Sequence, residues 1–212
     1  MKVKFCGLTS LADSLAAVEA GADLLGFNFY PPSPRYITPG NCARIILELR
    51  SLGMQVATVG VFVNAPVDEL LKIMESCRLD LAQLSGDESP EAVTAAGPTA
   101  FKALRPGNTA ALQESLSRYS PRPAPPAWLI DAHHPGKFGG TGQVAEWNLA
   151  RGLARKAPIL LAGGLNPENV AQAVRQVQPW GVDVASGIER SPGVKDDAKM
   201  RAFVDAVRMN EA

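Results

Sequence analysis

The sequence predicts an α/β fold, a single-domain (β/α)8 TIM barrel in which parallel strands alternate with helices. Its 212 residues, 46% of them hydrophobic, suffice for one large core. Short β-rich runs alternate with longer amphipathic stretches along the whole chain, and eight such pairs can be counted. The one composition shift, the proline-rich stretch 120–127, leads into a predicted strand and needs no domain boundary. We therefore expect one domain over residues 1–212.

The predicted strands are short runs of β-branched and other apolar residues bounded by turn residues. In order, they cover residues 3–6, 24–29, 57–63, 81–84, 100–104, 128–131, 159–162 and 182–185. The predicted helices are the amphipathic segments that follow each strand. They cover residues 11–20, 42–52, 67–77, 91–96, 110–119, 144–154, 168–177 and 198–209.

Turn residues separate each strand from the helix that follows. Gly7 directly follows the first strand, and a proline cluster at 31–34 follows the second. Strict alternation predicts parallel strands joined by right-handed crossovers, and eight repeats close a barrel. A doubly wound open sheet is the alternative, but its glycine fingerprint normally follows the first strand, where this chain has Cys6-Gly7-Leu8-Thr9.

Charge and cysteine content limit the partners. Lys plus Arg equal Asp plus Glu at 21 each, which favours neither nucleic acid nor a membrane as partner. Any phosphate site must then be local. Three widely spaced cysteines without a CxxC pair indicate reduced thiols and no zinc site, and the amino-terminal residues do not resemble a signal peptide. These features predict a cytoplasmic protein. The sequence fits a monomer and a homodimer equally well.

In a barrel, catalytic side chains come from the carboxyl ends of the strands. Cys6 ends the first strand, and Lys4 shares its face with α-carbons about 6 to 7 Å apart, so the ammonium could favour a thiolate. An inert buried cysteine is the alternative. Asp131 ends an apolar run, where a raised pKa would make it a general acid, although a turn-capping carboxylate fits equally well.

Glycine-bearing loops follow the last three strands. Gly139-Gly140-Thr141-Gly142 follows the sixth strand, Gly163-Gly164-Leu165-Asn166 the seventh, and Ser186-Gly187 the eighth. Glycines let backbone N–H groups approach a phosphate, and barrels often bind phosphate between their last two loops. Arg35, in a loop stiffened by prolines, has the planar fork that pairs with a carboxylate, unless it is a solvated surface residue.

Several motifs together resemble one family. The chain contains Lys4-Phe5-Cys6-Gly7-Leu8-Thr9, Gly21-Ala22-Asp23 with Gly26-Phe27, Ser33-Pro34-Arg35-Tyr36, Val61-Phe62-Val63-Asn64, Gly139-Gly140-Thr141-Gly142, Leu161-Ala162-Gly163-Gly164-Leu165-Asn166-Pro167-Glu168-Asn169-Val170 and Val184-Ala185-Ser186-Gly187-Ile188-Glu189. In this order and spacing they resemble phosphoribosylanthranilate isomerase of tryptophan biosynthesis. The resemblance extends from Lys2 to Phe203.

The resemblance implies a cofactor-free Amadori rearrangement of N-(5'-phosphoribosyl)anthranilate. By the family pattern, Asp131 protonates the furanose oxygen and Cys6 removes the C2 proton. Arg35 holds the anthranilate carboxylate. The backbones at Gly163, Gly164, Ser186 and Gly187 hold the phosphate. No cofactor and no metal are implied, because the substrate nitrogen is the electron sink.

Two positions depart from the family pattern. Ser85 stands where many members have histidine, in Gln83-Leu84-Ser85-Gly86, and Ala185 stands where many have serine. Other readings are a different phosphosugar barrel, such as indole-glycerol-phosphate synthase or a metal-dependent epimerase, and an idle phosphosugar-binding protein. The synthase would need lysines for ring closure, and the epimerase metal ligands at several strand ends, whereas the only histidines are the adjacent His133 and His134.

Overall fold

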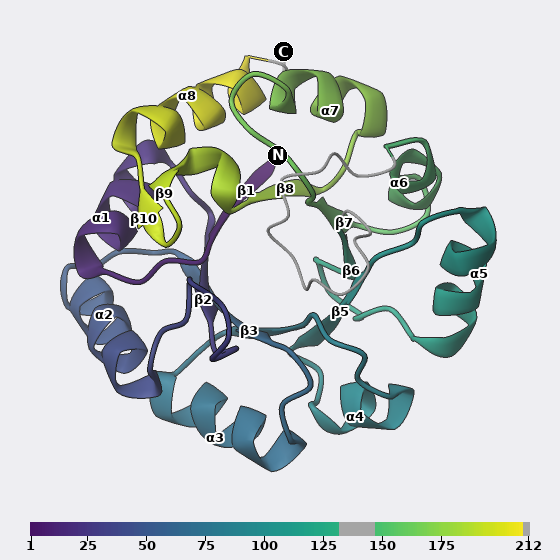
Figure 1. The fold of residues 1–212 in the computed structure, drawn as a ribbon, viewed down its shortest axis with the longest axis horizontal. Helices are drawn as coiled ribbons and strands as arrows, with labels where there is room; N and C mark the ends of the chain where they lie inside the picture. The colour runs from purple at the N-terminus through teal and green to yellow at the C-terminus, as the bar shows by residue number, and fades with distance from the viewer. Residues whose placement is uncertain (132–146, 210–212) are drawn as a thin grey trace.

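The computed structural model describes residues 1–131 and 147–209 of the chain, and these residues form the predicted barrel. Eight strands close on themselves in chain order, and every neighbouring pair is parallel (Figure 1). The strands are β1 (Lys2–Cys6), β2 (Leu24–Asn28), β3 (Ala57–Phe62), β4 (Leu81–Leu84), β5 (Ala100–Leu104), β6 (Trp128–Ile130), β7 (Ile159–Leu161) and β8 (Gly181–Val184). The open-sheet alternative is thereby excluded.

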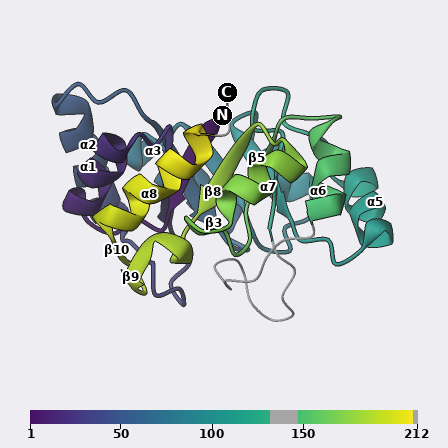
Figure 2. The same cartoon turned by 90° about the horizontal axis from the view of Figure 1, so that it is seen from above.

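The helices form a ring around the strands (Figures 1 and 2). They are α1 (Leu11–Ala20), α2 (Pro39–Ser51), α3 (Val67–Cys77), α4 (Pro90–Ala95), α5 (Thr109–Arg118), α6 (Trp147–Ala154), α7 (Val170–Val177) and α8 (Asp197–Arg208). Several begin at a side chain that accepts a backbone N–H of the first turn, as Ser10, Thr38 and Asn108 do. No helix of the described residues is long and apolar enough to cross a membrane.

Side-chain alternation along each strand divides the core into two parts. Outward residues such as Phe5 and Phe27 pack against the helices in the larger hydrophobic cluster. Inward residues such as Leu24, Val59 and Leu160 fill the barrel in a smaller cluster. At the carboxyl ends of the strands the inward series becomes polar, and these residues lie at the floor of a pocket. The alternation of side chains along the strands therefore decides which residues point into the pocket.

The structure corrects some predicted boundaries. Helix α2 begins at Pro39 rather than at residue 42, because Thr38 caps it and proline suits a first helical turn. Helix α7 begins at Val170 rather than at residue 168, because a turn stabilised by Asn166 and Asn169 precedes it. Of the predicted helix 144–154, residues 144–146 lie outside the described residues.

A segment between β8 and α8 was not predicted. It consists of a short 3-10 helix, η1 (Ser186–Ile188), and a hairpin of β9 (Glu189–Ser191) and β10 (Val194–Lys195). Gly193 turns this hairpin with a φ of 82°, which glycine adopts without strain. The hairpin lies at the end of the barrel where β1 and β8 end (Figures 1 and 2), and Lys195 contacts the backbone carbonyls of Cys6 and Ala185 there.

Gly187 provides a test of how closely the last two loops pack. A Cβ at Gly187 would overlap the Leu165 carbonyl oxygen, so Gly187→Ala should destabilise the protein by roughly 1–3 kcal/mol. Gly152 in α6 is the matched control, because a Cβ there meets nothing within 4 Å and helical Gly→Ala gains about 0.5–1 kcal/mol. Urea unfolding measures both. Equal stability of the two variants would contradict the close packing.

Candidate active site

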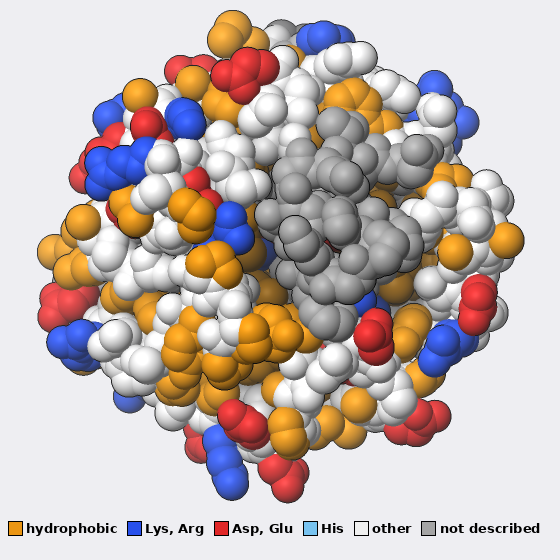
Figure 3. All heavy atoms as spheres, viewed as in Figure 1, with side chains coloured by type: hydrophobic (Ala, Val, Ile, Leu, Met, Phe, Trp, Pro, Cys, Tyr) orange, Lys and Arg blue, Asp and Glu red, His pale blue; other side chains and the backbone are white. Residues whose placement is uncertain are grey.

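One pocket at the carboxyl ends of the strands collects most of the predicted site residues. Its lining includes Cys6, Arg35, Asp131, Gly163, Gly164 and Ser186. These residues come from β1 and from the loops after β2, β6, β7 and β8. Hydrophobic side chains gather beside this mouth, over the ends of β2 and β3 (Figure 3). The sequence places these residues far apart, and barrel closure brings them together.

Cys6 stands above a buried ion pair. Lys4, two residues earlier on β1, points into the barrel, and its Nζ lies 2.8 Å from Asp183 Oδ1 of β8. The Lys4 side chain is fully buried. Gly26 makes room for both residues, since a Cβ there would lie 3.0 Å from Cys6 Sγ and 3.2 Å from Lys4 Cε. Glycine on β2 is therefore what allows a thiol and an ammonium to share this part of the barrel.

Burial and charge act in opposite directions on the thiol. Burial raises the pKa of Cys6 above its usual value, while Lys4 and Lys195 oppose that rise. Asp183 raises it further. The expectation that Lys4 alone would favour thiolate is therefore too simple. Lys4 itself remains an ammonium, because Asp183 and Cys6 outweigh its burial and raise its pKa.

Asp131 follows β6 directly and is half-buried. Its backbone N–H donates to the Leu104 carbonyl at 2.9 Å, which extends the parallel pairing with β5 by one residue. By the parity of β6, its side chain is on the inward series with Leu129, and it lines the pocket. Asp131 and Cys6 thus belong to the lining of one cavity.

The loops after β7 and β8 lie against each other. Gly163 and Gly164 have φ values of 94° and 66°, so the turn leaving β7 requires glycine. Asn169 Nδ2 donates to the Gly164 carbonyl at 2.9 Å and fixes that turn. Gly187 packs against Leu165, as described above. The missing Cβ of Gly187 therefore serves loop packing, and the predicted contact of its backbone with phosphate stays a prediction.

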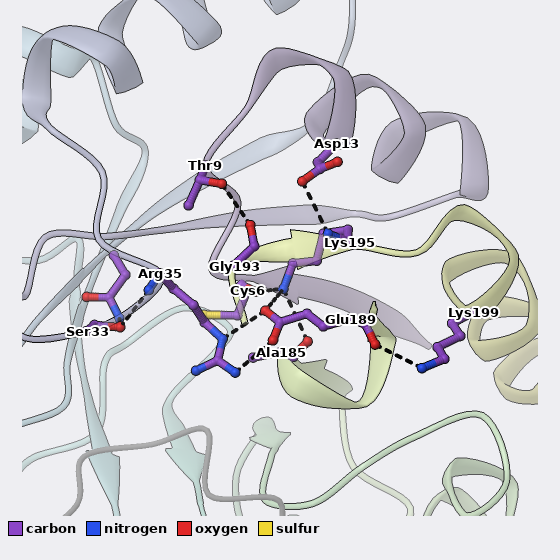
Figure 4. Close-up of polar contacts among 11 residues, drawn as sticks. Cys6, Thr9, Asp13, Ser33, Arg35, Ala185, Glu189, Gly193, Lys195 and Lys199 are labelled. Carbon is purple, nitrogen blue, oxygen red and sulfur yellow. Dashed lines mark hydrogen bonds and ion pairs between the residues drawn. The ribbon is translucent and has the colours of Figure 1, made fainter. Parts of the chain in front are cut away.

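Arg35 is held by a carboxylate of the protein. Its Nε and Nη2 each donate to Glu189 at 2.8 Å, and its backbone N–H donates to Ser33 Oγ at 3.1 Å (Figure 4). The Arg35 side chain is 13% exposed. The solvated-surface alternative is therefore wrong. The pairing also leaves the Nη1 amino group without a hydrogen bond to any described residue.

Sequence reasoning missed two parts of the site. Lys195 reaches Glu189 and the carbonyl of Cys6, which only the folded hairpin reveals. Gln83 lines the pocket floor, and its Nε2 donates to Ser85 Oγ at 3.0 Å. Gln83 Oε1 is buried without a partner among the described residues. The quoted motif contained Gln83, but nothing in its spacing indicated an unsatisfied acceptor.

Behind the pocket, a buried carboxylate fixes the loop that carries Ser85. Glu88 accepts the N–H groups of Asn64 and Gly86 and pairs with Lys102 at 2.8 Å. Burial alone would raise the pKa of Glu88, but Lys102 and the hydrogen bonds outweigh it and hold that pKa below its ordinary value. The loop Gly139-Gly140-Thr141-Gly142 and the pair His133 and His134 lie outside the described residues.

Comparison with known proteins gives a consistent result. The family model described as N-(5'phosphoribosyl)anthranilate (PRA) isomerase matches residues 3–206. The chain is 46% identical over 208 residues to an N-(5'-phosphoribosyl)anthranilate isomerase of Syntrophus aciditrophicus, covering 98% of this chain and 87% of the relative.

Solved structures are similar over almost the whole chain. The crystal structure of phosphoribosyl anthranilate isomerase from Thermotoga maritima aligns with a TM-score of 0.87 at 34% identity, covering 99% of both chains. A phosphoribosyl anthranilate isomerase in complex with reduced 1-(o-carboxyphenylamino)-1-deoxyribulose 5-phosphate aligns with a TM-score of 0.83 at 34% identity, also covering 99% of both chains.

The buried Glu88 predicts a specific acid sensitivity. Its depressed pKa means that its stabilisation is present above the ordinary value of 4.5 and is lost as the pH falls through the folded-state value. Glu88→Gln should therefore reduce the free energy of unfolding at pH 7 by about 1–3 kcal/mol and approach wild type in acid. Urea unfolding between pH 7 and pH 3 measures this. Glu114→Gln, at an exposed position, is the control. If the difference in unfolding free energy between wild type and Glu88→Gln stayed constant from pH 7 to pH 3, the predicted acid sensitivity would be wrong.

Proposed function

The chain belongs to the N-(5'-phosphoribosyl)anthranilate isomerase family, and from this membership we propose an Amadori rearrangement at the pocket of Cys6 and Asp131. The substrate is N-(5'-phosphoribosyl)anthranilate, and the product is 1-(2-carboxyphenylamino)-1-deoxyribulose 5-phosphate. As an isomerase of tryptophan biosynthesis, the chain needs a general acid, a general base and binding sites for two anionic groups of the substrate, the phosphate and the carboxylate. The observation that carries the proposal is that a single cavity presents candidates for all of these.

The proposed reaction balances without an external reactant. Asp131 donates a proton to the furanose oxygen, the C1–O bond breaks, and the nitrogen lone pair forms a C1=N iminium. Cys6 then removes the proton from C2, and the C–H electrons neutralise the iminium to give an enolamine. Reprotonation at C1 and loss of the hydroxyl proton at C2 yield the ketone. The substrate nitrogen is the electron sink, so the proposed route uses no cofactor.

The raised pKa of the Cys6 thiol fits this order of steps. The thiolate is the form that accepts a proton, and burial disfavours it. Ring opening creates a cationic iminium adjacent to C2, and a nearby positive charge favours the thiolate. Lys4 and Lys195 act in the same direction. The base is then most available once the acid has acted, which suits a reaction in which Asp131 works first.

Asp131 suits the role of acid by position. It is half-buried at the end of an inward series, and the residue below it, Leu129, is fully apolar. This position puts its carboxyl group on the wall of the cavity that Cys6 also lines. The turn-capping alternative left open by the sequence remains a rival that the variant below distinguishes.

We assign the two anionic ends of the substrate to two different parts of the cavity lining. The paired loops at 163–165 and 186–187 are the proposed phosphate site, because backbone N–H groups flanked by glycines can approach an anion closely. Arg35 Nη1 is the proposed partner of the anthranilate carboxylate. Binding at both ends would place the reacting carbons over Cys6.

The remaining expectations stay predictions. Balanced charge of 21 basic and 21 acidic residues favours a small-molecule partner over nucleic acid, and a cytoplasmic location is expected for a biosynthetic isomerase. Monomer and homodimer both remain open.

Removing the proposed base should separate chemistry from binding. Wild-type protein should consume phosphoribosylanthranilate, followed as loss of its fluorescence. Cys6→Ala should lower kcat by about 10² to 10⁴ while substrate affinity changes little, because only the positioned base is lost. Cys42→Ala, which removes a buried thiol of α2, is the matched control and should retain turnover. Absence of wild-type turnover would overturn the proposed function. Near wild-type turnover of Cys6→Ala would overturn only the base assignment.

Asp131→Asn should keep the shape of the side chain but lose its transferable proton. We expect kcat to fall by a factor of about 10² to 10⁴, as for loss of a general acid. Asp87→Asn is the control, since that carboxylate is exposed and pairs with Arg105 at the surface. Steady-state kinetics decide the matter. If Asp131→Asn raised KM at unchanged kcat, the residue would be a binding group and not the acid.

A further inference from the structure

We propose that Glu189 and Lys195 are positioning residues, which hold Arg35, the end of β1 and the end of β8 in one fixed arrangement. This inference rests on the proposed function and assigns roles to two residues of the unpredicted hairpin. Neither residue is proposed to touch the reacting atoms. They act through Arg35 and through the backbone of Cys6 and Ala185 (Figure 4).

Lys195 is fully coordinated. Its ammonium has three donors, and three acceptors surround it: the Cys6 carbonyl at 2.6 Å, the Ala185 carbonyl at 3.1 Å and Glu189 Oε1 at 2.9 Å. The side chain is completely buried. One cation thus joins the last residue of β1 to the residue directly after β8. These are the positions where the proposed base and the proposed phosphate loop begin.

Glu189 connects that cation to Arg35. Its Oε1 accepts from both Lys195 and Arg35 Nε, and its Oε2 accepts from Arg35 Nη2. Burial would raise the pKa of Glu189, but Arg35 and Lys195 outweigh it and hold that pKa below the ordinary value. The carboxylate therefore stays ionised. A bidentate pair fixes the plane of the guanidinium, so Nη1 has a defined direction.

The charges of this cluster do not cancel. Two cations, Arg35 and Lys195, share one carboxylate, Glu189. A network with a purely structural role is best neutral, because buried excess charge is costly. The surplus positive charge lies beside a pocket that is proposed to bind an anionic substrate. A substrate carboxylate at Nη1 would supply the missing negative charge.

The hairpin is also fastened to α1 and α8. Thr9 Oγ1 donates to the Gly193 carbonyl at 2.9 Å, the Lys195 N–H donates to Asp13 Oδ2 at 3.3 Å, and Lys199 Nζ donates to the Glu189 carbonyl at 2.8 Å (Figure 4). These contacts hold the hairpin in place without the buried cluster. Lys199 therefore offers a matched control, an ammonium on α8 that contacts the hairpin backbone but lies outside the charge network.

The first test compares two ligands. One is the reduced product analogue 1-(o-carboxyphenylamino)-1-deoxyribulose 5-phosphate, and the other is the same compound without its carboxylate. Wild type should prefer the carboxylated ligand, and Glu189→Gln should reduce that preference roughly tenfold, because a neutral amide cannot hold Arg35 bidentately. Calorimetric titration measures both dissociation constants. The ligand without carboxylate should bind both proteins alike.

The second test follows the thiol. Lys195→Met should move alkylation of Cys6 by iodoacetamide to higher pH, read on the Cys6 peptide by mass spectrometry. The charged groups facing Cys6 are Lys4, Asp183, Lys195 and Arg35, and only Lys195 is changed. Lys199→Met should leave the alkylation profile as in wild type. Cys42 and Cys77 are buried and read separately in their own peptides.

The outcomes separate this inference from the proposed function. An unchanged or increased carboxylate preference in Glu189→Gln would overturn the inference, since Glu189 would then be neutral toward the ligand or a competitor for Arg35. Equal alkylation profiles of Lys195→Met and Lys199→Met would overturn it for Lys195. If Lys195→Met does not fold, the carboxylate preference of the nearly isosteric Glu189→Gln variant decides whether the inference holds. Both readouts require no turnover, so inactive wild-type protein that still shows these differences would contradict only the proposed function.

Discussion

The closed barrel imposes one constraint on which the rest of the site depends: every second strand residue must lie inside. Apolar residues such as Leu24 and Leu160 satisfy it in the lower part of the barrel. Above them, Lys4 and Asp183 place opposite charges inside the protein, and these charges tolerate burial because they pair at 2.8 Å. Breaking the pair would leave one uncompensated buried charge. The ion pair thus supports the floor on which Cys6 stands, and Gly26 leaves the space that both side chains need.

The charged groups around the Cys6 thiol carry a net positive charge. Lys4, Lys195 and Arg35 surround Cys6 together with two carboxylates, Asp183 and Glu189. Three cations against two anions leave a local positive charge in a chain whose formal net charge is zero. Burial still outweighs these cations and raises the pKa of the thiol. In the proposed reaction, the cationic iminium would add to the stabilisation of the thiolate, so the proposed base would become available once the ring has opened.

The barrel could be predicted from the sequence because the signals for each strand and helix lie within a few neighbouring residues. Alternation and turn residues mark each strand, and a strand end marks where Cys6 and Asp131 must lie. The hairpin was missed for the opposite reason. Its strands span only three and two residues, too few to show a period, and Lys195 contacts Cys6 across 189 positions of sequence. Likewise, Arg35 offered no sign in its own loop that Glu189, 154 positions away, holds it.

The two departures from the family pattern fall where the structure depends little on the altered side chain. Ala185 lacks the serine hydroxyl of many relatives, but its contact with Lys195 uses the backbone carbonyl, which any residue supplies. Ser85 replaces a histidine, and its hydroxyl accepts from the Gln83 amide while Glu88 and Lys102 hold the loop from behind. Gln83 therefore stands beside Ser85 as a second polar group of the pocket lining, and its Oε1 has no partner among the described residues. A buried acceptor left unpaired lowers stability. In this fourth strand, the amide rather than residue 85 is thus the group whose presence requires a functional explanation.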